Sequence, residues 1–314
     1  MAQEPETEVV TLAALRTPEA GEHTQVLFNE LHRIYTIPHE GRTAERSLGL
    51  LREAAGSPRP LRVTVDPVKG AVRRVEVPTE AEVAQFERGR GVLEKPEKSY
   101  AVDLDRIDPT RFNVVDHHLK VPVFRLCKRI VPSYTKAKEI FDFCAAQSCH
   151  LGGPFDVSPC IPFQYVIDGC YARAHKMRWI ITTRFRYCCE KVFSYATDDF
   201  DTLAVQANKW GGCCVNWWYH VAPLIRVRVR LGKASVVLAM VVDPGMFDKP
   251  VLLSSWLYAQ ENKTCSANAK VSSWSIQPGS AYTPSFPPGS YATDDAYTAT
   301  DAKLNQYHAL VTCP

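Results

Sequence analysis

Apolar side chains recur with two different periods along this chain. Near the N-terminus they repeat at helical spacing over residues 42–56, and in residues 61–77 they alternate with polar residues on both sides of a Pro-Val-Lys-Gly turn. Thr79 and Glu82 then fit a capping box, which opens a further helix. The pattern predicts a small folded module of a hairpin and helices in this part of the chain, and not a disordered tail.

The C-terminal half shows the same two periods. Residues 213–230 alternate as a strand does, and residues 234–242 form an apolar run that is typical of a buried strand. A helical stripe of apolar positions starts at Cys170 and reaches Ile181. The pattern therefore predicts an α+β fold, in which an antiparallel sheet packs on the helix that begins at Cys170.

Composition divides the chain near residue 130. Residues 1–130 hold 20 acidic and 20 basic side chains, one cysteine and no tryptophan, whereas residues 131–314 hold ten cysteines and all six tryptophans. We therefore expect two domains, 1–130 and 131–314, with residues 100–133 as an extended connector. Cys127 either bonds into the second domain or marks an earlier boundary.

Charge and hydropathy exclude two classes of partner. The formal net charge is only +3, so charge indicates no binding of nucleic acid. No apolar run approaches the roughly 20 residues that a membrane span needs, so we expect no association with a membrane.

Cysteine usage points to an exported protein. The 11 cysteines do not form the paired CxxC motifs of a zinc site, and the adjacent His117 and His118 have no third ligand nearby in sequence, so we expect no metal and no other cofactor. Disulfides in a secreted protein fit better, with an export signal that this sequence does not include. A cytosolic protein with many free thiols is the alternative. The predicted disulfide pairs are Cys149 with Cys160, and Cys188 or Cys189 with Cys213 or Cys214.

Cys170 has an unusual position for a packing residue, because it follows the turn-forming pair Asp168-Gly169 and opens a helix. A helix N-terminus stabilises a thiolate through its partial positive charge and its free N–H groups. A thiol nucleophile also needs a base and an orienting acid. His220 on its alternating strand and Asp243 at the end of the next strand supply them if the strands are antiparallel neighbours. Taken singly, His220 is typical of a core histidine and Asp243 of a turn residue.

The other charged residues of this helix have a structural interpretation. His175 lies about 140° around the helix from Cys170, so it should point away from the thiol. Arg173, Lys176 and Arg178 are expected on a solvated helix face. If Cys170 stays free, the ten remaining cysteines suffice for five disulfides.

Three segments carry a resemblance to a known family: DGCYARAHKMR (168–178), CCVNWWYHVA (213–222) and VVDPGMF (241–247). They resemble the bacterial protein-glutaminases, which deamidate glutamine side chains in proteins. SPCIPFQY (158–165) is also similar, and the resemblance covers roughly residues 135–314. The order Cys, His, Asp is that of papain-like and transglutaminase-like cysteine enzymes, so the resemblance implies a core of that kind.

The resemblance implies roles for the site residues. Cys170 would be the nucleophile, His220 the general base and Asp243 the orienting carboxylate. The Cys170 N–H and an indole N–H, from Trp217 or Trp218, would stabilise the oxyanion. Glutamine would be converted to glutamate, with release of ammonia, through a thioester.

The resemblance also implies a precursor. Residues 1–130 would be an inhibitory pro-region, a maturation protease would remove it, and the enzyme would act as a secreted monomer on proteins with exposed glutamine. We expect an extended strand from residues 115–126 to cover the cleft. Two alternatives stay open: a cysteine protease or transglutaminase with the same triad, and a secreted, disulfide-linked binding protein without activity.

Overall fold

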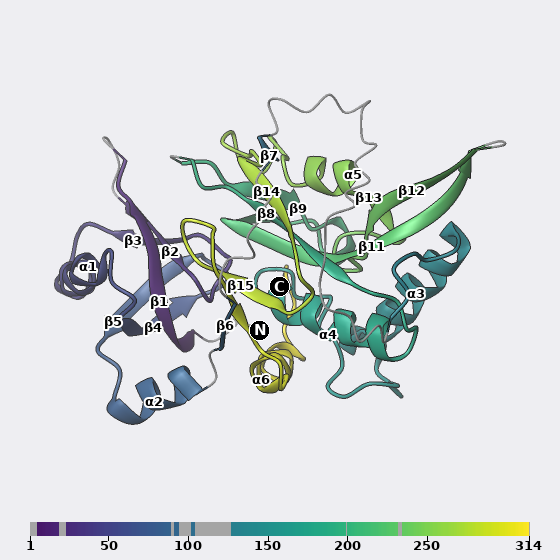
Figure 1. Ribbon diagram of the computed structural model, residues 1–314. Helices are drawn as coiled ribbons and strands as arrows, with labels where there is room; N and C mark the ends of the chain where they lie inside the picture. Colours follow the sequence, from purple (N-terminus) through teal and green to yellow (C-terminus); the bar gives the residue numbers. More distant parts are fainter. Residues whose placement is uncertain are drawn as a thin grey trace.

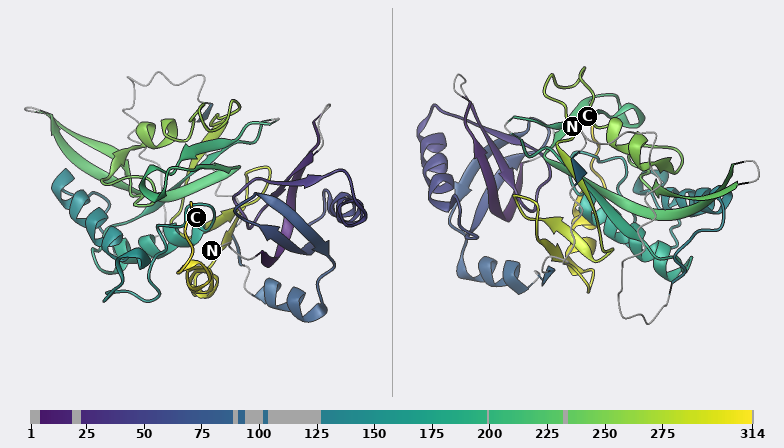
Figure 2. Two further views of the ribbon diagram at one scale, coloured as in Figure 1. Left: turned by 180° about the vertical axis from the view of Figure 1, so that it is seen from behind. Right: turned by 45° about the horizontal axis from the view of Figure 1, so that its top comes forward.

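A closed barrel and a larger sheet lie next to each other in the structure (Figure 1). The computed structural model describes residues 5–18, 23–88, 91–93, 102–103, 127–198, 200–231 and 234–313. We call the barrel, residues 6–76, the N-terminal barrel, and residues 127–313 the C-terminal region. Both orientations of Figure 2 keep these two bodies on opposite sides of the molecule, with α6 and β15 near their junction. No described helix has the length and apolarity that a membrane crossing requires.

The N-terminal barrel has the strand order β1-β2-β3-β5-β4. Its elements are β1 (Glu6–Arg16), β2 (His23–Phe28), β3 (Tyr35–Pro38), α1 (Arg42–Ala54), β4 (Pro60–Asp66) and β5 (Ala71–Glu76). The hairpin and the first helix that we predict from the sequence are β4, β5 and α1. The other strands and the closure were not predicted, because alternation within one strand does not identify its partners. A core that includes Leu51 and Val63 fills the barrel.

The second predicted helix is α2 (Glu80–Arg88), and the capping box is present. The Thr79 N–H donates to Glu82 Oε2 at 2.8 Å, and the Glu82 N–H donates to Thr79 Oγ1 at 3.3 Å. Beyond α2, the short strands β6 (Gly91–Leu93) and β7 (Val102–Asp103) pair with strands of the C-terminal region. The predicted cleft strand at residues 115–126, with His117 and His118, lies outside the described residues.

The C-terminal region is built on a sheet of order β13-β12-β11-β8-β14-β7, in which all neighbours are antiparallel. The strands of the C-terminal region, including those outside this sheet, are β8 (Glu190–Tyr195), β9 (Leu203–Gln206), β10 (Cys214–Trp217), β11 (Tyr219–Leu231), β12 (Ala234–Val241), β13 (Val251–Leu252), β14 (Ser273–Gln277), β15 (Ala281–Pro284) and β16 (Tyr291–Thr293). Its helices are α3 (Tyr134–Ala146), α4 (Cys170–Thr183), α5 (Leu253–Tyr258) and α6 (Thr298–Tyr307). The predicted α+β class is therefore confirmed, with α4 packed on β11.

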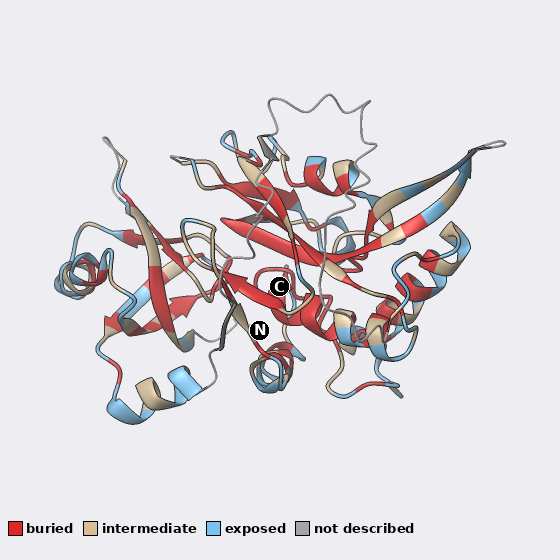
Figure 3. Ribbon diagram, viewed as in Figure 1, coloured by how far each residue is buried: buried red, intermediate tan, exposed pale blue. Residues whose placement is uncertain are grey.

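Helix α4 is buried on nearly all sides, which Figure 3 shows as a red helix beside a red sheet. The predicted solvated face is therefore wrong for two of its residues. Arg173 donates to the carbonyls of Tyr165 and Asp168, and Lys176 donates to the Ser158 carbonyl and pairs with Asp301 at 2.9 Å. The face is covered because α6, far away in sequence, packs on α4.

The structure contains four disulfides, and all lie in the C-terminal region. The bonds are Cys127–Cys188, Cys149–Cys160, Cys213–Cys313 and Cys214–Cys265. Cys149–Cys160 is the pair predicted across the short loop. The prediction that Cys188 or Cys189 bonds to Cys213 or Cys214 is wrong, and so is the expectation of five bonds, because Cys144 and Cys189 are buried free thiols. The bond at Cys127 links this residue to the C-terminal region and favours a domain boundary before it.

Candidate active site

The first turn of α4 presents Cys170 to the sheet. Gly169 precedes it with φ 78°, in the left-handed region that favours glycine, and a Cβ atom there would come within 2.9 Å of the Tyr307 ring. The Gly169 N–H donates to the Asp168 carboxylate at 2.7 Å. The turn that places the thiol therefore depends on the small residue at position 169 and on the acidic residue before it.

His220 and Asp243 meet because of the register of two strands. Leu224 on β11 pairs with Val241 at the end of β12, so Asp243 lies just beyond the strand and beside His220. The two side chains bond through His220 Nε2 and Asp243 Oδ2 at 2.9 Å. Trp256 Nε1 donates to the same oxygen at 2.9 Å. Burial raises the pKa of the Asp243 carboxyl, but these hydrogen bonds outweigh it, and the net shift is downward.

Two indoles hold the imidazole of His220 between them. The Trp217 ring is stacked on it with a centroid distance of 4.6 Å, and the Trp256 ring is stacked at 5.3 Å. With Nε2 bonded to the carboxylate, the ring has Nδ1 left for another partner. One ligand atom from His220 lies within 4.8 Å of the Cys170 sulfur, so the structure brings together the thiol, imidazole and carboxylate predicted from sequence.

The environment of the thiol differs from the one we expected. Burial raises the pKa of the Cys170 thiol well above its ordinary value, although Arg173 and a hydrogen bond from the Val221 backbone act in the opposite direction. The helix N-terminus was expected to lower this pKa. The thiol is only 1% exposed, and a buried thiolate loses its hydration. The covered state of the site therefore opposes ionisation.

The cover comes from the barrel. Residues 28–33, which we call the covering segment, connect β2 to β3 and reach the site. Within it His32 is fully buried, and its Nδ1 bonds to the Asp168 carboxylate at 2.5 Å. Neither His32 nor Asp168 was predicted as a site residue. His32 lies in no motif, and Asp168 was interpreted only as part of the turn before Cys170.

Electrostatics favour a neutral His32 beside an ionised Asp168. Burial lowers the pKa of His32 to about 4, although the Asp168 carboxylate raises it. Burial raises the pKa of Asp168, but His32 and Lys303 outweigh this effect and the net shift is downward. His32 Nδ1–H therefore donates to the carboxylate, and its Nε2 is the acceptor nitrogen.

Trp218 forms hydrogen bonds to the backbone of the covering segment. The Trp218 N–H donates to the His32 carbonyl at 2.8 Å, and Trp218 Nε1 donates to the carbonyls of Phe28 and Leu31, each at 2.9 Å. Trp217 Nε1 donates instead to the carbonyls of Val166 and Ile167. Both indoles suggested as oxyanion donors are therefore engaged, but the partners of Trp218 belong to the covering segment.

Comparison with known proteins gives one family and several solved structures. The sequence profile of a family described as Glutaminase matches residues 137–260. A search of curated proteins found no match. Two crystal structures, of pro-protein-glutaminase and of a mutant of it, are both 27% identical to the chain, with a TM-score of 0.70. They cover 98% and 99% of this chain respectively, and in both cases the match spans 95% of the solved protein.

Shorter solved proteins match part of the chain. The crystal structure of protein-glutaminase is 33% identical, with a TM-score of 0.51, and the match covers 59% of this chain and 92% of that protein. The NMR structure of protein-glutaminase from Chryseobacterium proteolyticum is 34% identical with the same coverage and TM-score. The chain is thus similar over nearly its full length to the pro-proteins and over part of its length to the shorter proteins.

Proposed function

The chain belongs to the protein-glutaminase family, and on this premise we propose that it deamidates glutamine side chains in proteins, with Cys170 as nucleophile, His220 as base and Asp243 as orienting carboxylate. The observation that carries the proposal is the placement of these three residues. The thiol opens α4, the imidazole lies on β11, and the carboxylate bonds to the imidazole at 2.9 Å. The arrangement supports a nucleophile, a base and an orienting acid in one site.

The reaction consists of two acyl transfers. His220 Nδ1 accepts the proton of Cys170, and the sulfur attacks the γ-carboxamide carbon of glutamine. The C–N bond breaks, and the nitrogen leaves as ammonia after His220 returns the proton. Water then loses a proton to His220 and attacks the thioester, which yields glutamate and restores the thiol. Asp243 keeps Nδ1 directed at the sulfur, because it holds Nε2 and stabilises the imidazolium that forms.

Oxyanion stabilisation is assigned to the start of α4. The Cys170 N–H at the helix N-terminus is one donor. The Trp218 indole N–H is the second once the covering segment leaves, since both of its acceptors belong to that segment. Trp217 is less suitable, because its N–H is bonded to carbonyls of the C-terminal region itself.

The N-terminal part, residues 1–130, is proposed as the inhibitory pro-region. His32 lies against Cys170 and His220, where a substrate side chain would have to enter. The similarity to pro-protein-glutaminase over 98% of the chain supports the same interpretation. A maturation protease would cut before Cys127, because the disulfide from Cys127 to Cys188 would keep residues 127–130 attached to the C-terminal region. The four disulfides support secretion. The active form is proposed to be a monomer.

Ammonia release from casein, measured before and after limited proteolysis, tests the function. We expect low release from the full chain and a large increase after cleavage. Cys170→Ala should abolish release, whereas Cys144→Ala, which removes another buried free thiol, should leave it largely unchanged. Release that persists in Cys170→Ala would disprove the proposal.

Mass spectrometry of the same reactions separates the alternatives. Deamidation exchanges a side-chain NH₂ for OH and leaves the chains intact and separate. A transglutaminase would join chains through lysine, and a cysteine protease would cut them. The geometry around Cys170 alone suits all three reactions, so cross-linked or cleaved casein without deamidated glutamine would reassign the activity.

A further inference from the structure

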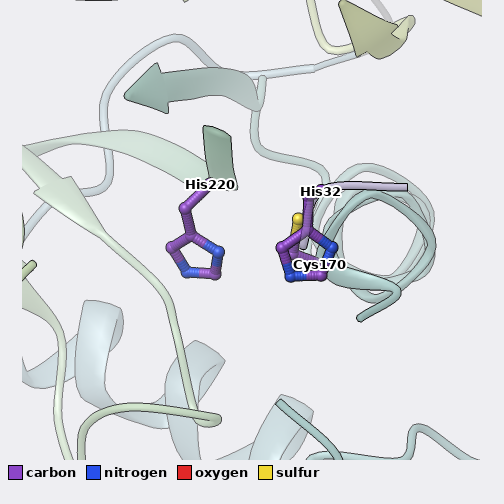
Figure 4. Close-up of side chains that lie close together, drawn as sticks. All are labelled: His32, Cys170 and His220. Carbon is purple, nitrogen blue, oxygen red and sulfur yellow. The ribbon is translucent and has the colours of Figure 1, made fainter. Parts of the chain in front are cut away.

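Three potential metal ligands converge at the contact between the barrel and the C-terminal region. They are His32, Cys170 and His220, and one ligand atom from each lies within 4.8 Å of the others (Figure 4). All three side chains are buried, with exposed fractions of 0%, 1% and 2%. Among the described residues, this is the only group of at least three His, Cys, Asp or Glu side chains with such spacing.

The two imidazoles are oriented by carboxylates on their outer sides. His32 Nδ1 bonds to Asp168, and His220 Nε2 bonds to Asp243. The other nitrogen of each ring, Nε2 of His32 and Nδ1 of His220, is buried without a hydrogen-bond partner among the described residues. Histidines that bind metals typically bond through their second nitrogen to a carboxylate, which fixes the tautomer and the ring orientation. Both histidines therefore have the arrangement of metal ligands.

Catalysis and inhibition leave part of this arrangement unexplained. The roles of nucleophile and base explain the presence of Cys170 and His220. Steric inhibition of these two residues would need only a side chain of suitable size at position 32. An apolar residue at position 32 would fill the space without a buried, unpaired nitrogen, which is unfavourable. The structure instead has an imidazole at this position, backed by Asp168, and Asp168 also accepts from the Tyr307 hydroxyl at 3.0 Å.

We propose that the full-length chain binds one Zn²⁺ ion through Cys170 Sγ, His32 Nε2 and His220 Nδ1. Zinc prefers thiolate and imidazole ligands in tetrahedral geometry, at about 2.3 and 2.0–2.1 Å, so its ligand atoms are about 3.3–3.8 Å apart. The three atoms need to approach one another by at most about 1.5 Å from the 4.8 Å limit. Water occupies the fourth position. Binding forms the Zn–S bond and releases the thiol proton to solvent.

The site exists only while the covering segment is in place. Zinc occupies both the nucleophile and the base, so it inhibits the unprocessed chain in addition to steric cover. Removal of the N-terminal part takes His32 away and leaves two protein ligands, which do not form a stable zinc site. The inference does not depend on glutamine as the substrate, because it concerns only the latent form and these three side chains.

Zinc titration of the full chain, prepared with its disulfides intact and its free thiols reduced, tests the proposal. Calorimetry should show one ion bound per chain in the parent. His32→Ala should weaken binding by about 100-fold, and Asp168→Asn, which removes the carboxylate partner of His32, by about tenfold. The matched control is His23→Ala, which removes an exposed histidine of the same barrel and should bind zinc as the parent does.

Cobalt binding tests the same site without a substitution at His32, so its result does not depend on whether a His32 variant folds. Co²⁺ added to the parent should give a thiolate-to-cobalt charge-transfer band, which Cys170→Ser should lose although Cys144 and Cys189 remain. Limited proteolysis that removes the N-terminal part should release the metal. The proposal fails if the parent binds no zinc, if His32→Ala binds it equally well, or if the cobalt band persists in Cys170→Ser. Ammonia release is measured separately, so a zinc-binding chain without deamidase activity would disprove only the proposed function.

Discussion

The N-terminal barrel and the C-terminal region achieve stability by different means. The C-terminal region has four disulfides and large buried aromatic residues such as Trp217, Trp218 and Trp256. Residues 1–126 contain no cysteine, and the barrel depends on its own mainly aliphatic core. A pro-region that ends before Cys127 has no disulfide to the C-terminal region, so cleavage is enough to release it. The C-terminal region keeps its own disulfides after that release. The difference suits a precursor in which release does not require unfolding.

The contact between the two regions combines polar bonds with apolar packing. Arg16 donates to the carbonyls of Ala196 and Asp201, and Glu8 pairs with Lys303 at 2.8 Å. Leu27 on β2 lies in the core of the C-terminal region, and Ala13, Ala14 and Ile34 pack against that core. Polar bonds in such a contact are a feature of interfaces between components that can separate.

Reduction of the disulfides should have the largest effect, and it should affect only one of the two regions. Each bridge contributes about 2–5 kcal/mol in small secreted domains, so reducing conditions should unfold the C-terminal region. Amide hydrogens of β4 in the barrel should stay protected. Hydrogen exchange followed by mass spectrometry checks both. Equal loss of protection in the two regions would show that the barrel is not an independent unit.

Removal of a large side chain from the core of the N-terminal barrel should have the next largest effect. Leu51 is fully buried, and Leu51→Ala should cost about 2–5 kcal/mol of the stability of the barrel. Because the barrel positions His32, the uncleaved variant should release ammonia faster than the uncleaved parent. The control is Leu151→Ala at an exposed position of the C-terminal region. If the barrel of the variant is destabilised but the uncleaved variant releases ammonia as slowly as the uncleaved parent, inhibition does not depend on the stability of the barrel.

Loss of an ion pair between the regions should have a smaller effect. Burial lowers the pKa of Lys303, but Glu8 outweighs it and the net shift is upward, which indicates a favourable pair. Glu8→Gln should weaken docking of the barrel by about 1 kcal/mol. The rate of limited proteolysis near the barrel measures this, with the exposed Glu53→Gln as control. If the two variants are cleaved equally fast, the pair does not contribute to docking.

A pH-dependent effect concerns a buried lysine of the C-terminal region. Lys191 donates to His175 Nδ1 at 2.7 Å and to the Ala281 carbonyl, and burial lowers its pKa well below the ordinary value. The unfolded chain therefore binds more protons at this residue than the folded chain. It follows that this contribution to stability rises with pH up to the ordinary pKa of lysine.

Comparison with Lys191→Met isolates that contribution. Between pH 6 and pH 8.5, the denaturation midpoint of the parent should rise relative to that of the variant, because only the parent takes up this proton on unfolding. The range stays below the ordinary pKa of tyrosine and of free thiols. Parallel midpoints over this range would show that Lys191 is charged in the fold as it is in the unfolded chain.

Local signals in the sequence predicted much of the C-terminal region. The start of α4 at Cys170, the strand of His220 and the strand end before Asp243 all follow from periodicity and turn residues. Burial of Arg173 and Lys176 did not, because it depends on tertiary contacts. Arg173 bonds to the carbonyls of Tyr165 and Asp168, and Lys176 pairs with Asp301 of α6. Pairing of the cysteines was predicted only across the shortest loop, since the other bonds join elements 51 to 100 residues apart.

His32 shows the limit of such reasoning most clearly. Its neighbours form no motif, and its partner Asp168 is 136 residues away. The segment that we expected in the cleft, residues 115–126, was chosen because it lies close in sequence to the enzyme domain. That segment lies outside the described residues, and the prediction stays untested. Residues 28–33 reach the site because β2 and β3 of the barrel hold them there.

The sequence by itself determined the chemistry of this protein: a thiol at a helix start, an imidazole on a strand, and a carboxylate at the end of the next. These are local features, which hydrophobic periods of two and 3.6 residues and turn-forming residues predict. The tertiary structure decided the distance between those groups, the burial that opposes ionisation of Cys170, and the identity of the segment that covers it. Such contacts depend on strand register and on docking between distant segments, and no local pattern encodes either of them.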